Sequence, residues 1–442
     1  MKRYFLITAL SLGMLACDDD DDSGMIPGNA EETEFRVTIT NIGTAFPIFQ
    51  SGIFDTPVGE SAAGPATPGQ LYSFEFYATP GMYLSFATML VQTNDIFIAP
   101  ESDTGIPLFD NGTPIEGDIT SLFTFWDAGT EVNEEPGSGP NQAPRQNGPD
   151  TGIDENGVVA ELSAVNDGFT YPSIEGVVTI SLQAVDDGSN MFVLTIENIS
   201  GNSTLPGPVS PGAYAIHSPA VQLFTTGEPA SEGLEDIAED GNPAALGDFT
   251  RANTGLVTPF SPGVYVVYNS SATPLFEEGQ TDQGNGLEAI AEDGNPAMLA
   301  MALGTNNDVS SYGVFNTPVS ASSPGPVFAG QSYSFTIMAS PGDRLNLATM
   351  LIQSNDLFIA YGEGGLPLFN GSSPAEGDVT PGFRIWDAGT EVNEFPGAGP
   401  NQAPRQSGPD TGTIESEPIE EVNDGFTYPG ASDLITITVR VI

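Results

Sequence analysis

The sequence predicts an all-β protein made of two antiparallel β-sandwich domains. Short segments alternate apolar and polar residues, as strands with one buried face do. The chain has 52 glycines and 37 prolines among 442 residues, which is too many for long helices. Long motifs also occur twice, about 260 residues apart. A period of that length indicates a duplicated domain rather than a solenoid.

The N-terminus has the form of an export signal. Residues 1–16 contain the basic pair Lys2 and Arg3 followed by an apolar run, and Cys17, the only cysteine, comes next. The run is too short to span a bilayer. Its end, Met-Leu-Ala-Cys, resembles the lipobox of bacterial lipoproteins. We therefore expect residues 1–16 to be a signal peptide and Cys17 to be lipidated; the alternative is an ordinary exported protein with a free cysteine.

Residues 17–34 are expected to form an acidic tether behind the lipidated cysteine. Five consecutive aspartates, Asp18 to Asp22, cannot pack together and stay solvated. An acidic stretch in this position resembles the surface-export signals of some Gram-negative lipoproteins. The expected location is therefore the cell surface, as an outer-membrane lipoprotein on the extracellular face.

The charge balance excludes several classes of partner and site. Nine basic and 59 acidic residues give a net charge of −50, and after Arg3 the chain has seven arginines, no lysine and one histidine. Such a surface repels nucleic acid and anionic lipid headgroups and attracts cations. A single cysteine excludes an internal disulfide framework, and a single histidine excludes a polyhistidine metal site.

The first domain is expected to span residues 35–185 and the second residues 190–442. Both open with a similar strand, 35–41 (PheArgValThrIleThrAsn) and 192–198 (PheValLeuThrIleGluAsn), in which every second residue is apolar. Clusters of Gly, Pro, Asn and Asp separate the other expected strands. These strands are 71–78, 84–91, 177–183, 332–339, 345–352 and 434–441.

The second domain is expected to carry an insert, residues 208–304, that the first domain lacks. The insert is itself duplicated: Gly-Leu-Glu-Asp-Ile-Ala-Glu-Asp-Gly-Asn-Pro at 233–243 recurs almost unchanged at 286–296. Each piece predicts a short helix, because its Leu and Ile lie three positions apart on one face. For the helix after the second piece, Asn295 is the expected N-cap and Gly304 the expected end.

The most distinctive motif is Trp-Asp-Ala-Gly-Thr-Glu-Val-Asn-Glu, at 126–134 and again at 386–394. In both places an Ala-Thr-Met-x4-Asn-Asp segment precedes it, and Gly-Pro-Asn-Gln-Ala-Pro-Arg-Gln and Val-Asn-Asp-Gly-Phe-Thr-Tyr-Pro follow it. This series resembles the spondin domain, the N-terminal module of F-spondin and mindin, over most of the chain. The resemblance implies C2-like antiparallel β-sandwiches that bind calcium through loop carboxylates, act in adhesion and extracellular recognition, and have no catalytic activity.

The resemblance also implies the calcium ligands. They are Asp95, Asp127 and Glu131 in the first copy, and Asp356, Asp387 and Glu391 in the second. The animal proteins have aspartate where the two glutamates stand. Calcium takes six to eight oxygen ligands. Gly129 permits a tight turn between Asp127 and Glu131, and Asn133 is a candidate to complete the shell.

Other recurring residues have structural interpretations that we favour over functional ones. Trp126 and Trp386 are expected to anchor the core rather than stack on carbohydrate. Arg145 and Arg405 are expected to pair with carboxylates and order proline-rich loops; the alternative is an anionic ligand. Asp167 and Asp424 are interpreted as turn residues; the alternative is that they donate to calcium from an adjacent loop. His217, which has no counterpart in the other copy, is interpreted as a residue without a chemical role.

The sequence therefore predicts a surface-anchored, calcium-binding lipoprotein in adhesion or extracellular recognition. Its expected partners are the outer membrane, through the lipid anchor, and an extracellular matrix, glycan or cell-surface ligand. One alternative is a structural surface or stalk protein with purely stabilising calcium. Another is a glycoside hydrolase, which needs a carboxylic pair. No HExxH, GxSxG or glycine-rich phosphate loop is present, so no enzymatic activity is expected.

Overall fold

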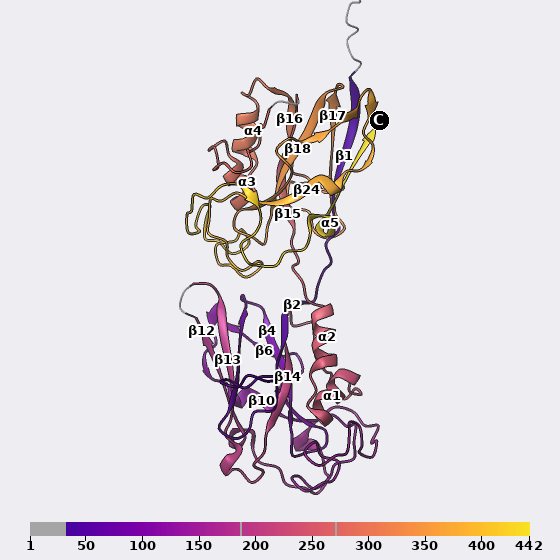
Figure 1. The fold of residues 1–442 in the computed structure, drawn as a ribbon, viewed down its shortest axis with the longest axis vertical. Coiled ribbons are helices and arrows are strands. Elements are labelled where there is room, and N and C mark those ends of the chain that lie inside the picture. Colours follow the sequence, from indigo (N-terminus) through magenta and orange to yellow (C-terminus); the bar gives the residue numbers. More distant parts are fainter. Residues whose placement is uncertain (1–31, 186–187, 270–271) are drawn as a thin grey trace, which may run out of the picture.

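The computed structural model describes residues 32–185, 188–269 and 272–442. The expected signal peptide, the lipidated Cys17 and nearly all of the acidic tether lie outside these residues. The described chain forms two lobes stacked along the long axis (Figure 1). Both lobes consist mainly of antiparallel sheets with a few short helices, which confirms the all-β prediction.

Lobe one, residues 47–255, pairs a four-stranded sheet with a seven-stranded sheet. The strand order is β3-β13-β12-β9 in the first and β11-β10-β5-β4-β14-β2 in the second, where β6 also pairs with β4. The strands are β2 (Ile48–Phe54), β3 (Leu71–Tyr77), β4 (Tyr83–Leu90), β5 (Ile96–Pro100), β6 (Ile106–Pro107), β9 (Gly117–Asp118), β10 (Phe123–Asp127), β11 (Ala160–Glu161), β12 (Val178–Ala184), β13 (Met191–Asn198) and β14 (Val209–His217), with a small hairpin of β7 (Phe109–Asp110) and β8 (Thr113–Pro114).

Lobe two, residues 33–41 and 256–442, repeats this architecture. Its sheets have the orders β17-β1-β26-β23 and β16-β15-β18-β19-β24-β25, and β20 pairs with β18. The elements are β1 (Thr33–Asn41), β15 (Phe260–Asn269), β16 (Val309–Phe315), β17 (Ser332–Ala339), β18 (Asp343–Leu351), β19 (Leu357–Tyr361), β20 (Leu366–Pro367), β21 (Phe369–Asn370), β22 (Ser373–Pro374), β23 (Gly377–Asp378), β24 (Phe383–Asp387), β25 (Glu420–Glu421), β26 (Ile435–Val441) and the short helix α5 (Ala431–Leu434).

Each lobe has its main core between its two sheets. In lobe one, Phe76 of β3 stacks on Phe192 of β13, with ring centroids 5.6 Å apart, and Phe86 of β4 stacks on Phe123 of β10 at 4.7 Å. All four side chains are at most 1% exposed. The alternating residues that predicted the strands are therefore the residues that fill this core.

The predicted domain boundaries are wrong at the N-terminal strand. β1 lies between β17 and β26, so residues 35–41 belong to lobe two and not to the first domain. The equivalent strand of lobe one is β13, between β3 and β12, although the prediction placed residues 192–198 in the second domain. The two strands bury the same alternating face, so their sequences suit either lobe, and only the path of the chain decides between them.

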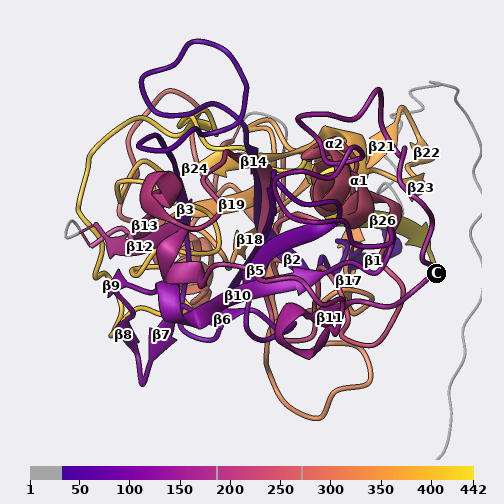
Figure 2. The ribbon, with the colours of Figure 1, turned by 90° about the horizontal axis from the view of Figure 1, so that it is seen from below.

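The prediction that residues 208–304 are an insert of the second domain alone is also wrong. The helices α1 (Glu232–Asp240) and α2 (Ala244–Ala252) cover the outer face of the seven-stranded sheet of lobe one. The helices α3 (Leu287–Asp293) and α4 (Ala297–Leu303) cover the same face in lobe two (Figure 1). Figure 2 shows α1 and α2 next to each other, seen from below. This face is apolar in both lobes, with Phe97 in one and Phe358 in the other fully buried, so each lobe needs a covering layer.

The predicted short helices are confirmed, and local signals explain their ends. The Ser231 side chain accepts the backbone N–H of Leu234 at the start of α1, and Gly241 ends that helix in the left-handed conformation at φ 66°. The N-cap of α4 is Pro296, one residue after the predicted Asn295, and the helix stops before Gly304 as predicted. Asn295 Oδ1 nevertheless accepts the N–H of Ala297 at 3.1 Å.

The two lobes meet through a loop of lobe two. The ring of Phe395 stacks on Tyr77 of lobe one, with centroids 4.0 Å apart, and makes an edge contact with Phe49 at 5.9 Å. The Asn190 side-chain amide donates to the carbonyl of Ala398 at 2.8 Å. The residue of lobe one equivalent to Phe395 is Glu135, which faces no partner lobe. The two copies therefore diverge at the place where one of them docks.

Replacing Phe395 by glutamate, the residue of the first copy, is expected to separate the lobes. The stacked aromatic contacts are worth about 1–2 kcal/mol, and a carboxylate here faces the ring of Tyr77. Small-angle scattering of Phe395→Glu should give a larger radius of gyration, while the melting of each lobe changes little. The matched control is Glu135→Phe in lobe one, which should leave the scattering curve unchanged. An unchanged curve for Phe395→Glu would show that this loop does not hold the lobes together.

Candidate metal centre

The strand register brings the first two predicted ligands of each copy together. Asp127 is the last residue of β10 and pairs with Ile96, the first residue of β5. Asp95 directly precedes Ile96, so both carboxylates lie at the same end of neighbouring strands. In lobe two, Asp387 pairs with Leu357 in the same way, and Asp356 is the residue before Leu357.

Asp95 is completely buried, and only one of its oxygens is satisfied. Oδ2 accepts the backbone N–H groups of Thr130 at 3.0 Å and Glu131 at 3.2 Å, while Oδ1 is buried without a hydrogen-bond partner. Asp127 accepts the N–H of Gly129 at 2.7 Å and the side-chain amide of Asn133 at 2.6 Å. Burial first, and then the charge of Asp127, raise the pKa of Asp95 well above its usual range.

The second copy repeats this arrangement. Asp356 Oδ2 accepts the N–H groups of Thr390 and Glu391 at 2.8 and 3.1 Å, and its Oδ1 is again buried without a partner. Burial and the nearby charge of Asp387 raise the pKa of Asp356 to about 7. One carboxylate oxygen each of Asp356, Asp387 and Glu415 lie within 4.8 Å of one another. These three groups form a possible cation site.

Glu415 and its counterpart Glu155 were missed in the sequence analysis. Burial, followed by the charge of Asp127, raises the pKa of Glu155, and burial, followed by Asp387, raises that of Glu415. Glu415 therefore completes a group of three carboxylates with Asp356 and Asp387, whereas Glu155 is related to its aspartate pair only through the effect of the Asp127 charge. The sequence does contain one signal for these glutamates: both copies have an acid at this position, about 260 residues apart, which is the separation of the two copies of the motif.

Glu131 and Glu391, by contrast, direct their carboxylates to a neighbouring place. Glu131 accepts the N–H of Gly152 at 2.5 Å and the side-chain amide of Asn94 at 3.0 Å. One of its oxygens lies within 4.8 Å of carboxylate oxygens of Asp150 and Glu239. The side chain of Glu131 thus joins a cluster with helix α1, and what it offers to Asp95 is its backbone N–H.

The tight turn predicted at Gly129 is present in both copies. Gly129 has φ 68° and Gly389 has φ 65°, a conformation that favours glycine. A Cβ atom at Gly129 would lie 2.7 Å from the backbone nitrogen of Val158, and one at Gly389 would lie 2.4 Å from the carbonyl oxygen of Glu417. The glycine therefore lets the acidic loop fold closely over the following segment.

The two tryptophans are core anchors, as predicted. Trp126 is 3% exposed, donates its indole N–H to the carbonyl of Pro100 at 3.0 Å, and contacts Phe224 edge-on at 4.9 Å. Trp386 makes the equivalent contacts with Ala360 and Phe276. Each tryptophan joins the strand that bears the acidic loop to the helical layer.

The prediction that Arg145 and Arg405 pair with carboxylates is wrong. Arg145 donates to the carbonyl of Gly139 at 2.8 Å and to the side-chain oxygens of Gln92, at 3.0 Å, and Gln142. Arg405 makes the equivalent bonds. The guanidinium group folds the proline-rich loop around itself through neutral acceptors, because the local carboxylates are engaged by amides elsewhere.

Asp167 and Asp424 make the hydrogen bonds expected of turn residues, and His217 is held inside lobe one. Asp167 accepts the N–H of Phe169 at 2.9 Å and the hydroxyl of Tyr171 at 2.6 Å, and Asp424 does the same in lobe two. The ring of His217 is buried against the Ser85 hydroxyl at 2.9 Å and the carbonyl of Ser218 at 2.7 Å.

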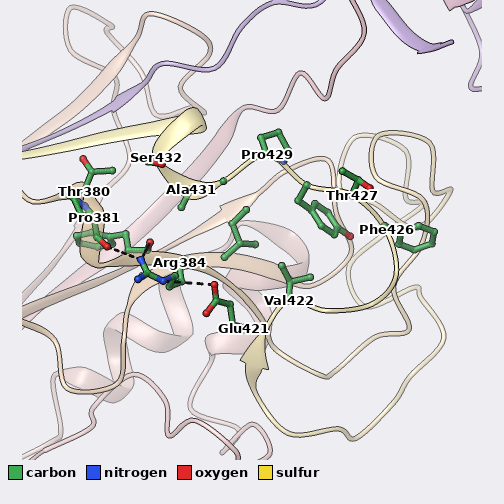
Figure 3. Close-up of a pocket in the computed structure, with 14 residues that line it drawn as sticks. Thr380, Pro381, Arg384, Glu421, Val422, Phe426, Thr427, Pro429, Ala431 and Ser432 are labelled. Carbon is green, nitrogen blue, oxygen red and sulfur yellow. Dashed lines mark hydrogen bonds and ion pairs between the residues drawn. The ribbon is translucent and has the colours of Figure 1, made fainter. Parts of the chain in front are cut away.

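A pocket of about 510 Å³ lies beside β24, on the surface of lobe two (Figure 3). Arg384 lies at its wall, where it donates to the carbonyl of Pro381 at 2.7 Å and faces Glu421 at 3.8 Å. A pocket of about 370 Å³ occupies the equivalent place in lobe one, where Thr124 replaces Arg384. The two pockets therefore lie at equivalent positions of the duplicated lobes, but only the pocket of lobe two has an arginine in its wall.

Comparison with protein-family models and with curated proteins finds no match to this chain. Within the described residues, no helix is both long enough and apolar enough to cross a membrane.

Proposed function

We propose that this chain is a calcium-binding surface lipoprotein whose two spondin-type, C2-like sandwiches act in adhesion or in recognition of an extracellular matrix or glycan ligand. The observation that carries the proposal is the repeated buried aspartate, Asp95 and Asp356, each with one oxygen that has no partner. A buried carboxylate oxygen without a partner is costly. Its occurrence at the same place in both copies favours a ligand over a local accident.

The donor set fits calcium. Asp95, Asp127 and Glu155 in lobe one, and Asp356, Asp387 and Glu415 in lobe two, offer carboxylate oxygens only, which suits a hard cation that takes six to eight oxygens. No lysine follows Arg3 in the sequence, and neither ion pair in the described part of the chain involves these residues. A bound cation would supply the missing positive charge and order the acidic loops.

The proposed location follows from the N-terminal motif. Cys17 would carry the lipid, and the acidic segment would lead from the outer membrane to β1. That strand runs from the far end of lobe two toward lobe one (Figure 1). Lobe two would therefore lie nearer to the membrane, and lobe one would be presented outward to the partner.

Calcium is expected to raise the melting temperature of both lobes. At a hundred times the dissociation constant, one bound ion adds about 2.7 kcal/mol, which is about 5–10 °C for a lobe of this size. The measurement is calorimetry of the full chain in calcium and in EDTA. Asp127→Asn combined with Asp387→Asn should remove the part of the shift that this site supplies, whereas exposed acids changed in the control, Asp110→Asn with Asp308→Asn, should preserve the full shift. Equal melting in calcium and EDTA would sink the proposal.

A glycan and matrix array distinguishes recognition from a purely structural role. Saturable binding that EDTA reverses supports adhesion, while the absence of any binding favours a stalk or surface protein with stabilising calcium. Screening on polysaccharides addresses the third candidate, a glycoside hydrolase. The pocket beside β24 gives the array a specific variant, because Arg384→Ala should weaken an anionic ligand if that pocket receives it.

A further inference from the structure

A second carboxylate cluster lies between the acidic loop and the helical layer of each lobe. In lobe two it contains Glu288 and Glu292 of α3 and Asp410 of the loop that follows β24. One oxygen from each of the three lies within 4.8 Å of the other two. None of these residues belongs to the Asp356 and Asp387 pair, although the cluster borders that pair, because the charge of Asp356 acts on Glu292.

Lobe one has a corresponding cluster. Glu239 of α1 and Asp150 of the loop occupy the positions of Glu292 and Asp410, and with Glu131 they again bring three carboxylate oxygens within 4.8 Å. Glu235, the counterpart of Glu288, lies close enough to Asp150 for that charge to raise its pKa, after burial as the main cause. The helix and the loop therefore meet through acids in both copies.

The acids of α3 are badly placed for a helix on its own. Glu288 and Glu292 are four residues apart and lie on one face, where like charges destabilise a helix. The arginine ion pairs of the described residues are Arg251 with Asp248 and Arg384 with Glu421, and neither reaches this cluster. Compensation must therefore come from protons or from a bound cation.

Glu292 supplies an independent sign of a ligand. The residue is 2% exposed, and its Oε1 atom is buried without a hydrogen-bond partner, although the carboxylate points into the cluster. Glu239 is 3% exposed in the equivalent place. Burying an ionised carboxylate costs several kcal/mol unless an opposite charge accompanies it. Burial is also the main reason why the pKa values of Glu239 and Glu292 rise to about 8.

The loop that carries Asp150 in lobe one, or Asp410 in lobe two, packs closely against a glutamate of the acidic loop. A Cβ atom on Gly412 would lie 2.1 Å from the Glu391 carboxylate, and one on Gly152 would lie 2.0 Å from that of Glu131. The side chain of Glu391 accepts the N–H of Gly412 at 2.7 Å, and its charge acts on Glu292. The glycines thus let the loop that carries Asp150 and Asp410 pack closely against Glu131 and Glu391 of the acidic loop.

We infer that each lobe holds a second divalent cation, of the calcium type, between the helical layer and the acidic loop. The ligands are Glu288, Glu292 and Asp410 in lobe two, and Glu131, Asp150 and Glu239 in lobe one. Carboxylates from several segments suit calcium, which accepts many oxygens in flexible geometry. This inference goes beyond the proposed function and does not rest on it. It gives the duplicated helical segment a role, because the ion joins that segment to the acidic loop.

Native mass spectrometry of the full chain in calcium tests the inference by counting bound ions. We expect two ions per lobe in the wild type. Glu239→Gln combined with Glu292→Gln should lose one ion from each lobe, and so should Asp127→Asn combined with Asp387→Asn, from the other site. The exposed acids Glu228 and Glu277 provide the control pair, as glutamines. Because the glutamine variants remove repulsion, they should fold at least as well as the wild type without calcium.

Hydrogen exchange gives a second readout that does not depend on the count. Calcium should slow exchange in α1 and α3 in the wild type, but not in Glu239→Gln with Glu292→Gln. The inference is overturned if this variant keeps every ion of the wild type, or if the wild type binds only ions that Asp127→Asn with Asp387→Asn removes. The second outcome leaves the proposed function intact. Loss of ions only through the helix variants would instead overturn the proposed function and support the inference.

Discussion

Removal of residues 1–42 is expected to leave lobe two unfolded and lobe one folded. β1 lies between β17 and β26, pairing with β17 from Thr33 to Thr40 and with β26 from Phe35 to Asn41. Its loss separates the two neighbours and opens an unpaired edge on each. Lobe one takes no strand from this part of the chain, so it should keep its own cooperative transition.

The expected loss is comparable to the whole stability of a lobe. Phe35, Val37 and Ile39 are fully buried in the core of lobe two, and each contributes about 1.5–3 kcal/mol. Asn41 adds two hydrogen bonds from its side-chain amide, to the carbonyls of Thr258 at 3.0 Å and Val327 at 3.1 Å. Typical domains are stable by about 5–15 kcal/mol in total, so little remains without β1.

Calorimetry and limited proteolysis check this expectation. The control is the chain lacking residues 1–31, which retains β1 and should show both transitions. A peptide of residues 32–42, added to the shorter chain, should restore protection of lobe two by strand addition. Two undiminished transitions in the chain lacking residues 1–42 would contradict the structural role of β1.

In the absence of metal, the protein is expected to lose stability as the pH rises from about 5 to 8. The pKa of Asp356 rises to about 7, and those of Glu239 and Glu292 rise to about 8, in each case mainly through burial. Between the unfolded and folded pKa values, the folded state holds protons that the unfolded chain has released. Stability is therefore fully present below the unfolded pKa values and falls as the pH rises through the folded ones.

The size of this effect follows from the same linkage. A pKa difference of one unit between the two states is worth about 1.4 kcal/mol, and the two raised groups of lobe two together predict a loss of several kcal/mol over this pH range. Lobe two gives the clearer reading, because the single histidine, His217, is in lobe one. Burial lowers the pKa of His217, so its contribution has the opposite sign, with stability increasing as the pH rises toward 6.5.

Urea unfolding of metal-stripped protein at pH 5 and pH 8 measures the loss. Glu239→Gln with Glu292→Gln should flatten the dependence, and saturating calcium should remove it, because a bound cation favours the ionised carboxylates. Asp118 and Asp378 provide an internal contrast. Hydrogen bonds from Thr120 and Thr380 lower their pKa values, so the stability that they add is lost only below about pH 4. A metal-free protein that is more stable at pH 8 than at pH 5 would contradict the proposed burial of ionisable acids.

The local elements were predictable because their signals are local. The strand at 192–198 alternates apolar and polar residues, and β13 follows that alternation from Met191 to Asn198. The spacing of Leu and Ile in residues 233–243 predicted a short helix with one apolar face, and α1 buries Leu234 and Ile237. These features depend on the residue and its nearest neighbours, which is why one sequence was enough to place them.

Which lobe each strand belongs to was not predictable from such local signals. β1 and β13 carry the same pattern, but one completes lobe two and the other completes lobe one. The two lobes are circularly permuted relative to each other. In lobe one, β13, β14, α1 and α2 come after the other elements, whereas in lobe two β15, α3 and α4 come before β16 to β26. Periodicity does not encode which partner strand is reached after a long connection.

The candidate metal site was likewise predictable only in part. The duplicated motif identified Asp95, Asp127 and their counterparts as acids at matching positions, and strand register is what places each pair at one end of the sheet. The motif also grouped Glu131 with them, but its carboxylate faces Asp150 and Glu239, while the charge of Asp127 acts on Glu155.

By itself, the sequence determined that this protein is an all-β chain with a duplicated body, short capped helices and paired acidic loops. The tertiary structure decided which strand closes each lobe, that the helices cover both lobes, that Phe395 docks one lobe on the other, and which acids meet. The physical reason is range. Caps, turns and alternation act between residues close in the chain, whereas a carboxylate's neighbours and a strand's partners come from segments tens to hundreds of residues away.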